Sequence, residues 1–197
     1  MLDDATYHDV VRRGNLAPSI HNAQPTRWRR QGDHIEIAAD LAVSLPQADP
    51  DGDGVALSVG AAVEATVLAL GAHGTGATVT THWRDDDRHS WPRHRMAARL
   101  ALVPAAPQPL AAQLEARHTW RGAFAAETPR LFGWSRNDTR LVLDDAGRHM
   151  IADLNDAASL GILRHKPFRQ ELLSWMRLTP RHPRYLYDGL SVEGLRL

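Results

Sequence analysis

Hydrophobic side chains recur with helical spacing over residues 3–13, where Tyr7, Val10 and Val11 share one face. An aspartate opens this stretch and can cap a helix, because its carboxylate accepts backbone N–H groups that have no intrahelical partner. Gly14 follows as a stop signal. The pattern therefore predicts a first helix that ends near residue 13.

A period of two replaces the helical period in residues 34–38. Ile35 and Ile37 alternate there with polar neighbours, which is typical of a half-buried strand. A Gln-Gly-Asp turn at residues 31–33 joins this stretch to residues 27–30. We expect a β-hairpin.

The longest apolar run predicts a core helix over about residues 54–72. It is apolar nearly all round, which predicts burial on most sides. Small residues at positions 60–62 make part of it thin, so another helix or a subunit could approach closely. Glu64 near its middle favours a buried helix over a membrane span.

An acidic run, Asp49-Pro50-Asp51-Gly52-Asp53, precedes the core helix. It resembles the start of a calcium loop, but the position that needs a bidentate Glu is Gly60. We expect a turn whose acids cap the core helix, since carboxylates favour a helix N-terminus.

The rest of the chain alternates strand-like and helix-like stretches. The pattern predicts strands at 76–83, 99–103 and 139–143, and helices at 110–116, 144–163 and 168–178. Residues 181–197 have no strong period, and we expect them to act as a lid or cover.

Composition narrows the possible functions. The chain has 197 residues, 43% of them hydrophobic, which fits one domain with a real core. A net charge of zero makes nucleic acid and anionic membranes unfavourable partners. The absence of cysteine excludes disulfides and thiolate catalysis. With an acidic N-terminus that does not resemble a signal peptide, we expect a cytoplasmic protein.

Histidines at positions 82, 89 and 94 invite a zinc interpretation. Their spacing is loose and arginines interrupt it, so a solvated loop is the better prediction and no metal is expected.

The stretch Ala17–Pro25 carries the most chemistry. Two prolines rigidify it, and hydrogen-bonding side chains lie between them. It can be a rigid loop whose polar inner face suits a planar ligand with donors and acceptors along one edge, as in a flavin. It can equally be a helix-to-strand connection whose side chains cap backbone groups. The hydrogen-bonding side chains are Ser19, His21, Asn22 and Gln24.

A second polar cluster follows at residues 117–121, Arg-His-Thr-Trp-Arg. Arginine can hold a phosphate with two parallel hydrogen bonds, and Thr119 adds a hydroxyl donor. On one turn of helix, Arg117 and Arg121 would share a face. The other interpretation is a solvated arginine pair.

Together these stretches resemble the Acg-type branch of the FMN-dependent nitroreductase-like family. Residues 17–25 are similar to its A-P-S-x-H-N-x-Q-P-W signature, and the following 27–29 are similar too. Residues 48–52 resemble its T-D-P-D-G segment, 117–124 its R-[RH]-[ST]-x-R-x-x-F flavin-phosphate motif, and 187–190 its D-G-[IV]-P segment. The similarity spans nearly all of the chain.

The resemblance implies an α+β fold, a nitroreductase-like mixed sheet flanked by helices. Residues 1–104 would form an N-terminal half, and 105–197 the flavin-phosphate motif with a lid-like helical segment of an incomplete second half. It also implies FMN as cofactor. The phosphate and ribityl chain would be held by Arg117, His118, Thr119 and Arg121, and the flavin ring would be lined by Pro18, Ser19, His21, Asn22 and Gln24.

Two features depart from the family pattern. Thr26 stands where the family has tryptophan, which removes a packing anchor beside the loop. Acg-type chains are also much longer and fuse two halves into a pseudo-dimer. We expect either a fragment or a short form that completes its flavin site as a homo- or hetero-oligomer, because a half-domain would expose a large apolar face.

The activity that the resemblance implies is transfer of hydride or electrons from NAD(P)H to a small organic acceptor. The chemistry would be that of the flavin, so no general acid or base is assigned. Two other hypotheses stay open: a non-enzymatic protein that sequesters FMN, and a degenerate interaction protein that keeps the scaffold without the cofactor.

Overall fold

A four-stranded antiparallel sheet forms the centre of the molecule in the computed structural model, which describes residues 2–84, 91–120, 122, 142 and 144–195. The strand order is β1-β2-β4-β3. The strands are β1 Thr26–Gln31, β2 His34–Asp40, β3 Thr75–Thr81 and β4 His94–Pro104.

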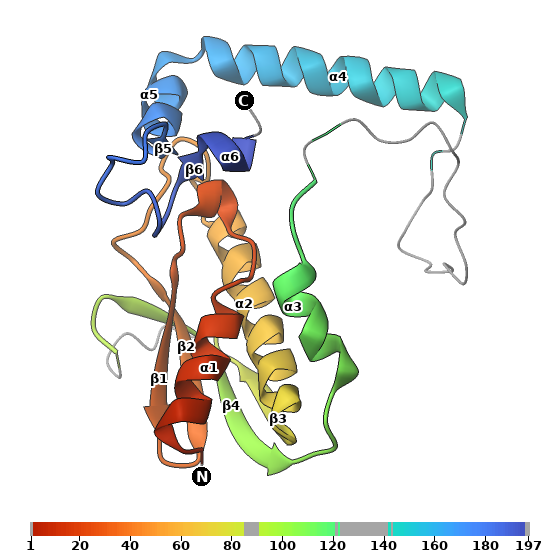
Figure 1. Ribbon diagram of the computed structural model, residues 1–197. Helices are drawn as coiled ribbons and strands as arrows, with labels where there is room; N and C mark the ends of the chain where they lie inside the picture. Colours follow the sequence, from red (N-terminus) through yellow and green to blue (C-terminus); the bar gives the residue numbers. More distant parts are fainter. Residues whose placement is uncertain (1, 85–90, 121, 123–141, 143, 196–197) are drawn as a thin grey trace.

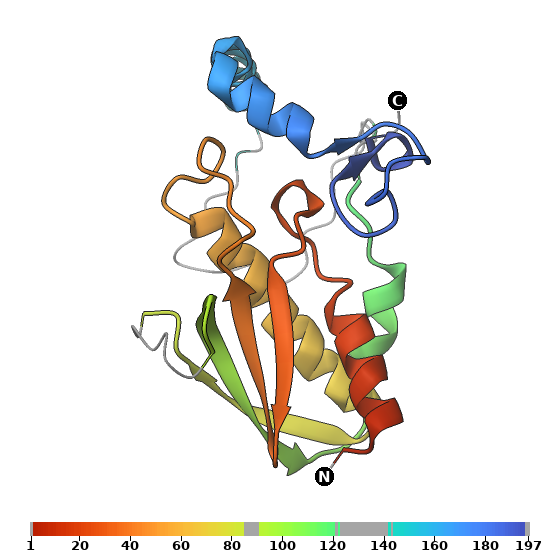
Figure 2. The ribbon, with the colours of Figure 1, turned by 90° about the vertical axis from the view of Figure 1, so that its left-hand side faces the viewer.

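Two helices cover one face of this sheet (Figures 1 and 2). Helix α2, Asp53–Ala72, packs on the strands, and α1, Asp4–Gly14, packs beside α2. The predicted α+β class with helices flanking a sheet is confirmed. Parallel pairing in the described residues occurs outside the main sheet, between β5, Met176–Arg177, and β6, Leu190–Ser191.

The predicted hairpin is confirmed as β1 and β2. Gln31 pairs with His34 at its tip, and Gly32 has a positive φ of 58° that the tight turn requires. Ile35 and Ile37 are fully buried against the helical layer. The strand is not half-buried as predicted, because Glu36 between them is also buried (3% exposed) and pairs with Arg29 and Arg99.

Helix α2 is the core helix that the apolar run predicts. Val59, Ala62 and Leu70 on it are buried. Its start is capped as expected, because the Asp49 carboxylate accepts the backbone N–H of Gly54 and of Val55, both at 2.8 Å. By length and composition this helix alone in the described residues could cross a membrane, yet its buried side chains pack in the core.

Most positions of α2 are buried or half-buried, as predicted, but one strip of the helix is exposed. Leu57 is 77% exposed, and Gly60 and Glu64 are also exposed. A Cβ added at Gly60 would meet nothing within 4 Å. The sheet, α1 and later segments of the chain therefore cover most of the helix and leave one narrow strip uncovered.

The described segments after the sheet form several short elements and one long helix. The 3₁₀ helix Pro109–Ala112 leads into α3, Gln113–Ala116, and later come α4, Asp145–Arg164, and α5, Lys166–Ser174. Helix α4 has no buried residue and runs across the top of Figure 1, in contact with α5.

Two sequence predictions change in this region. The helix predicted to reach residue 178 ends at Ser174, because Met176 and Arg177 pair with β6 instead. The tail predicted as a cover contains β6 and the short helix α6, Val192–Leu195. The strand predicted at 139–143 lies outside the described residues except for Val142.

Asp9 ties α1 to the end of α2 and gives the protein an acid-sensitive contact. Its carboxylate accepts hydrogen bonds from Arg12 at 2.8 Å and Arg13 at 2.9 Å, and lies 2.9 Å from His73 Nε2. The hydrogen bond from Arg12, then that of His73, lowers the pKa of Asp9 from 3.8 to about 2 against the opposing effect of burial.

A folded-state pKa below the unfolded value means that this stabilisation is complete above pH 4 and disappears as the pH falls towards 2. We expect wild type to exceed Asp9→Asn in unfolding free energy by about 1 kcal/mol at pH 6, after allowance for solvent screening. Urea unfolding at pH 6, 4 and 2.5 should show the difference shrinking with acid. A difference that stays constant across this range would contradict the assignment.

Candidate functional site

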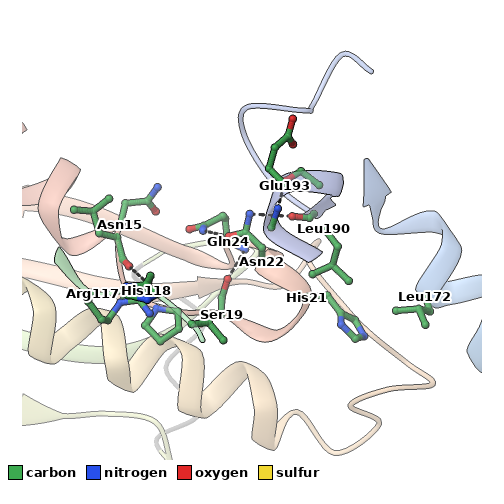
Figure 3. A pocket seen from close by; sticks show the side chains of 17 residues that line it. Asn15, Ser19, His21, Asn22, Gln24, Arg117, His118, Leu172, Leu190 and Glu193 are labelled. Carbon is green, nitrogen blue, oxygen red and sulfur yellow. Dashed lines mark hydrogen bonds between the residues drawn. The ribbon is translucent and has the colours of Figure 1, made fainter. Parts of the chain in front are cut away.

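A cavity of about 790 Å³ lies at the end of the sheet where α2 begins (Figure 3). Three separate segments form its walls. The first is the Ala17–Pro25 loop with the residues before it, the second is residues 117–119, and the third comprises Leu172 on α5 and positions between 189 and 194.

The loop has a strained backbone that its own hydrogen bonds hold. It contains the 3₁₀ turn Ile20–Asn22, and His21, Asn22 and Gln24 all have φ near +50°, a region that side chains other than glycine rarely adopt. The Ser19 hydroxyl accepts the N–H of Gln24 at 3.1 Å, and the Ser58 hydroxyl on α2 accepts the N–H of Ile20 at 3.0 Å. Such strain is typical of functional loops.

Asn22 joins the loop to the C-terminal segment. Its side-chain amide donates to the carbonyl of Gly189 at 3.0 Å, and the Gly189 N–H donates to the carbonyl of Asn22 at 2.9 Å. Gln24 donates from Nε2 to Asn22 Oδ1 at 2.5 Å. Two amides are therefore fixed side by side on the cavity wall (Figure 3).

The backbone at position 189 requires a glycine. Its φ is 81°, and a Cβ there would lie 2.4 Å from the carbonyl oxygen of Trp175. The preceding Asp188 is 4% exposed and accepts hydrogen bonds from Arg177, itself 5% exposed. This buried pair anchors the segment that forms the third wall.

His21 has an unusual environment. Its Nε2 is buried without a hydrogen-bond partner in the described part of the chain. Burial lowers the pKa of the imidazole, and the nearby charge of Glu171 opposes this effect. A lowered pKa keeps the ring neutral at pH 7, so His21 can offer the cavity an uncharged imidazole.

Arg117 reaches the loop from an extended backbone. Helix α3 ends at Ala116, as the predicted helix does, and Arg117 has φ −65° and ψ 130°, so the backbone is extended at this residue. Its guanidinium Nη2 donates to the carbonyl of Leu16 at 3.0 Å. His118 and Thr119 line the cavity beside it.

The structure thus brings eight of the nine sequence-predicted site residues to one cavity; Arg121, the ninth, lies outside the described residues. The third wall was not assigned from the sequence, although the Asp-Gly dipeptide at 188–189 was a signal for it. The residues brought together are Pro18, Ser19, His21, Asn22, Gln24, Arg117, His118 and Thr119.

The donor set suits a ligand with an anionic tail and a polar ring edge. A guanidinium and a hydroxyl can hold phosphate oxygens, and neighbouring amides can pair with alternating donors and acceptors. FMN combines these two parts, so the residues present fit it. Among the described residues no group of His, Asp and Glu could hold a metal ion.

No protein-family model matches the chain. Two curated Mycobacterium tuberculosis proteins do: "Putative NAD(P)H nitroreductase MT3217" from strain CDC 1551 and "Putative NAD(P)H nitroreductase Rv3131" from strain H37Rv. Each is 34% identical over 128 residues, which cover 62% of this chain and 35% of the relative. The chain therefore spans about a third of the length of these relatives.

Solved structures with lower similarity include nitroreductases. One is a "putative nitroreductase in complex with FMN" from Desulfovibrio desulfuricans, 18% identical, covering 66% of this chain and 87% of that chain with a TM-score of 0.46. Another is the nitroreductase CinD from Lactococcus lactis in complex with nicotinic acid, 13% identical, covering 73% and 91% with a TM-score of 0.46. In sequence, this chain is similar to these two proteins named "Putative NAD(P)H nitroreductase" over about a third of their length.

Proposed function

We propose that this chain binds FMN in the 790 Å³ cavity and works as an NAD(P)H-dependent oxidoreductase of the Acg-type nitroreductase-like family. One observation carries the proposal. The amide-rich loop and the arginine segment, far apart in the sequence, form walls of the same cavity. The 34% identity to NAD(P)H nitroreductases supports the same conclusion.

The residues divide by chemistry into two groups. Arg117, His118 and Thr119, with Arg121 two positions further along the chain, would hold the phosphate and ribityl chain. The loop from Pro18 to Gln24 would line the ring, with the amides of Asn22 and Gln24 along its polar edge. When bound, FMN supplies the hydride chemistry; the protein positions it and excludes water.

The test is a spectrum of the purified protein. We expect flavin absorbance, or its appearance with quenched FMN fluorescence when FMN is added in equal amount. NADH or NADPH should then bleach the bound flavin, and an acceptor such as a nitrobenzene should restore the colour. A protein that stays colourless and leaves FMN fluorescence unchanged at high FMN concentration refutes the proposal.

A second candidate is an FMN-binding protein without turnover. The third wall motivates it, because Leu172 and residues 189–191 line the cavity and a wall at this position could bar a nicotinamide. This function predicts tightly bound FMN that neither NADH nor NADPH bleaches. Rapid turnover with a nitroaromatic would reject it.

A further inference from the structure

The cavity carries opposite charges on its two sides. Arg117 and His118 lie on one side, and Glu193 lies on the other, beyond the amides of Asn22 and Gln24 (Figure 3). Glu193 is the one acidic side chain among the described residues that line the cavity. The Glu193 side chain is exposed and extends away from these amides in Figure 3, so its carboxylate lies at the rim of the cavity and not inside it.

Glu193 is held in place without losing its charge. It lies on α6, directly after β6, and its carboxylate accepts a hydrogen bond from the Tyr185 hydroxyl. That hydrogen bond is the main reason why the pKa of Glu193 is lowered. The carboxylate is therefore ionised at neutral pH.

No salt bridge neutralises Glu193 within the part of the chain that the structure describes. The other nearby acid, Glu171, is engaged elsewhere, because its carboxylate accepts the N–H of Gln47 at 2.9 Å and of Ala48 at 2.8 Å. The buried Asp188 is paired with Arg177 and Arg184. Among the described residues, Glu193 thus supplies the negative charge at this rim that no salt bridge offsets.

We propose that Glu193 selects the electron acceptor by charge, favouring cationic over anionic aromatic compounds at the end of the cavity opposite Arg117. This inference rests on the proposed function, in which Arg117 holds the phosphate and the acceptor enters at the other end. Because the Glu193 side chain is exposed, its charge acts through solvent on a ligand that approaches this rim, and added salt should weaken the effect. The Glu193 carboxylate also repels anionic compounds, and such repulsion is one way in which a site rejects wrong ligands.

The experiment compares nitrobenzenes that carry trimethylammonium, carboxamide or sulfonate at the same ring position. Reduction of each to the nitroso compound takes a hydride from NAD(P)H and a proton from water, and releases one oxygen as water. We expect kcat/KM of the FMN-loaded protein at low salt to be about threefold higher for the cation than for the anion, because solvent screens an exposed carboxylate. Glu193→Gln should bring this ratio close to one.

Two variants separate the local charge from other effects. Glu64→Gln removes an exposed carboxylate on α2 that does not line the cavity, and it should leave the ratio unchanged. Tyr185→Phe removes the hydroxyl that holds Glu193, and it should reduce the ratio in part. If Glu64→Gln changes the cation-to-anion ratio of kcat/KM as much as Glu193→Gln does, the inference is wrong.

Binding supplies a readout that does not depend on turnover. Calorimetric titration with trimethylanilinium and with benzenesulfonate should show the same preference, and Glu193→Gln should remove it. If FMN does not bind, the proposed function fails, and the titration of the flavin-free protein still tests Glu193. If FMN binds and turns over, but Glu193→Gln changes neither the kcat/KM ratio nor the binding preference for the cation, then only the charge selection is wrong.

Discussion

Arg117→Ala should weaken FMN binding about 100-fold, because a guanidinium that pairs with a phosphate makes charge-assisted hydrogen bonds worth about 1.5–3 kcal/mol. Arg117 also holds the loop through its 3.0 Å hydrogen bond to the Leu16 carbonyl. Fluorescence titration of FMN at low salt measures the change. Adding Arg121→Ala should weaken binding further, by a few kcal/mol in total.

Matched variants show whether the loss is local. Arg117→Lys keeps the charge but not the planar fork, so its affinity should lie between wild type and Arg117→Ala. Arg148→Ala removes an exposed arginine on α4 that pairs with Asp145, outside the cavity lining, and should not change the affinity. Equal FMN affinity in wild type and Arg117→Ala would remove Arg117 from the phosphate site.

Local patterns predicted the parts of the fold that local interactions decide. The Gln-Gly-Asp turn and the alternation around Ile35 and Ile37 predicted the hairpin, but they did not predict that Glu36 between them is buried too. The acidic run before α2 specified its cap because Asp49 needs only nearby N–H groups. The loop and the arginine segment were recognised from short motifs of hydrogen-bonding residues.

The rest depends on contacts between distant parts of the chain. Helical spacing would put Arg117 and Arg121 on one face of a turn. Instead α3 ends at Ala116, and the side chain of Arg117 reaches back to the Leu16 carbonyl. The third wall depends on parallel pairing of β5 with β6 and on the two hydrogen bonds between Asn22 and Gly189. Periodicity does not encode such partners.

Asp188→Ala should destabilise the C-terminal segment by about 3–5 kcal/mol, because it leaves the buried Arg177 guanidinium without its counter-charge. Asp188 Oδ1 accepts Arg177 Nε at 3.0 Å and lies 2.9 Å from Nη2, and its Oδ2 accepts Arg184 Nε at 2.5 Å. Hydrogen exchange should rise over residues 176–195 far more than in α2. FMN affinity should fall as well, since Gly189 would no longer be held against Asn22.

A rescue variant distinguishes the unpaired charge from a general packing defect. Arg177→Met combined with Asp188→Leu replaces the pair by apolar side chains, and such replacements of buried ion pairs are often neutral or stabilising. Exchange protection over residues 176–195 should therefore return in the double variant. Asp145→Ala, which breaks an exposed pair with Arg148 on α4, should leave that protection unchanged. If Asp188→Ala alone keeps full protection, the buried pair does not anchor the third wall, and the link from Asn22 to Gly189 must hold it unaided.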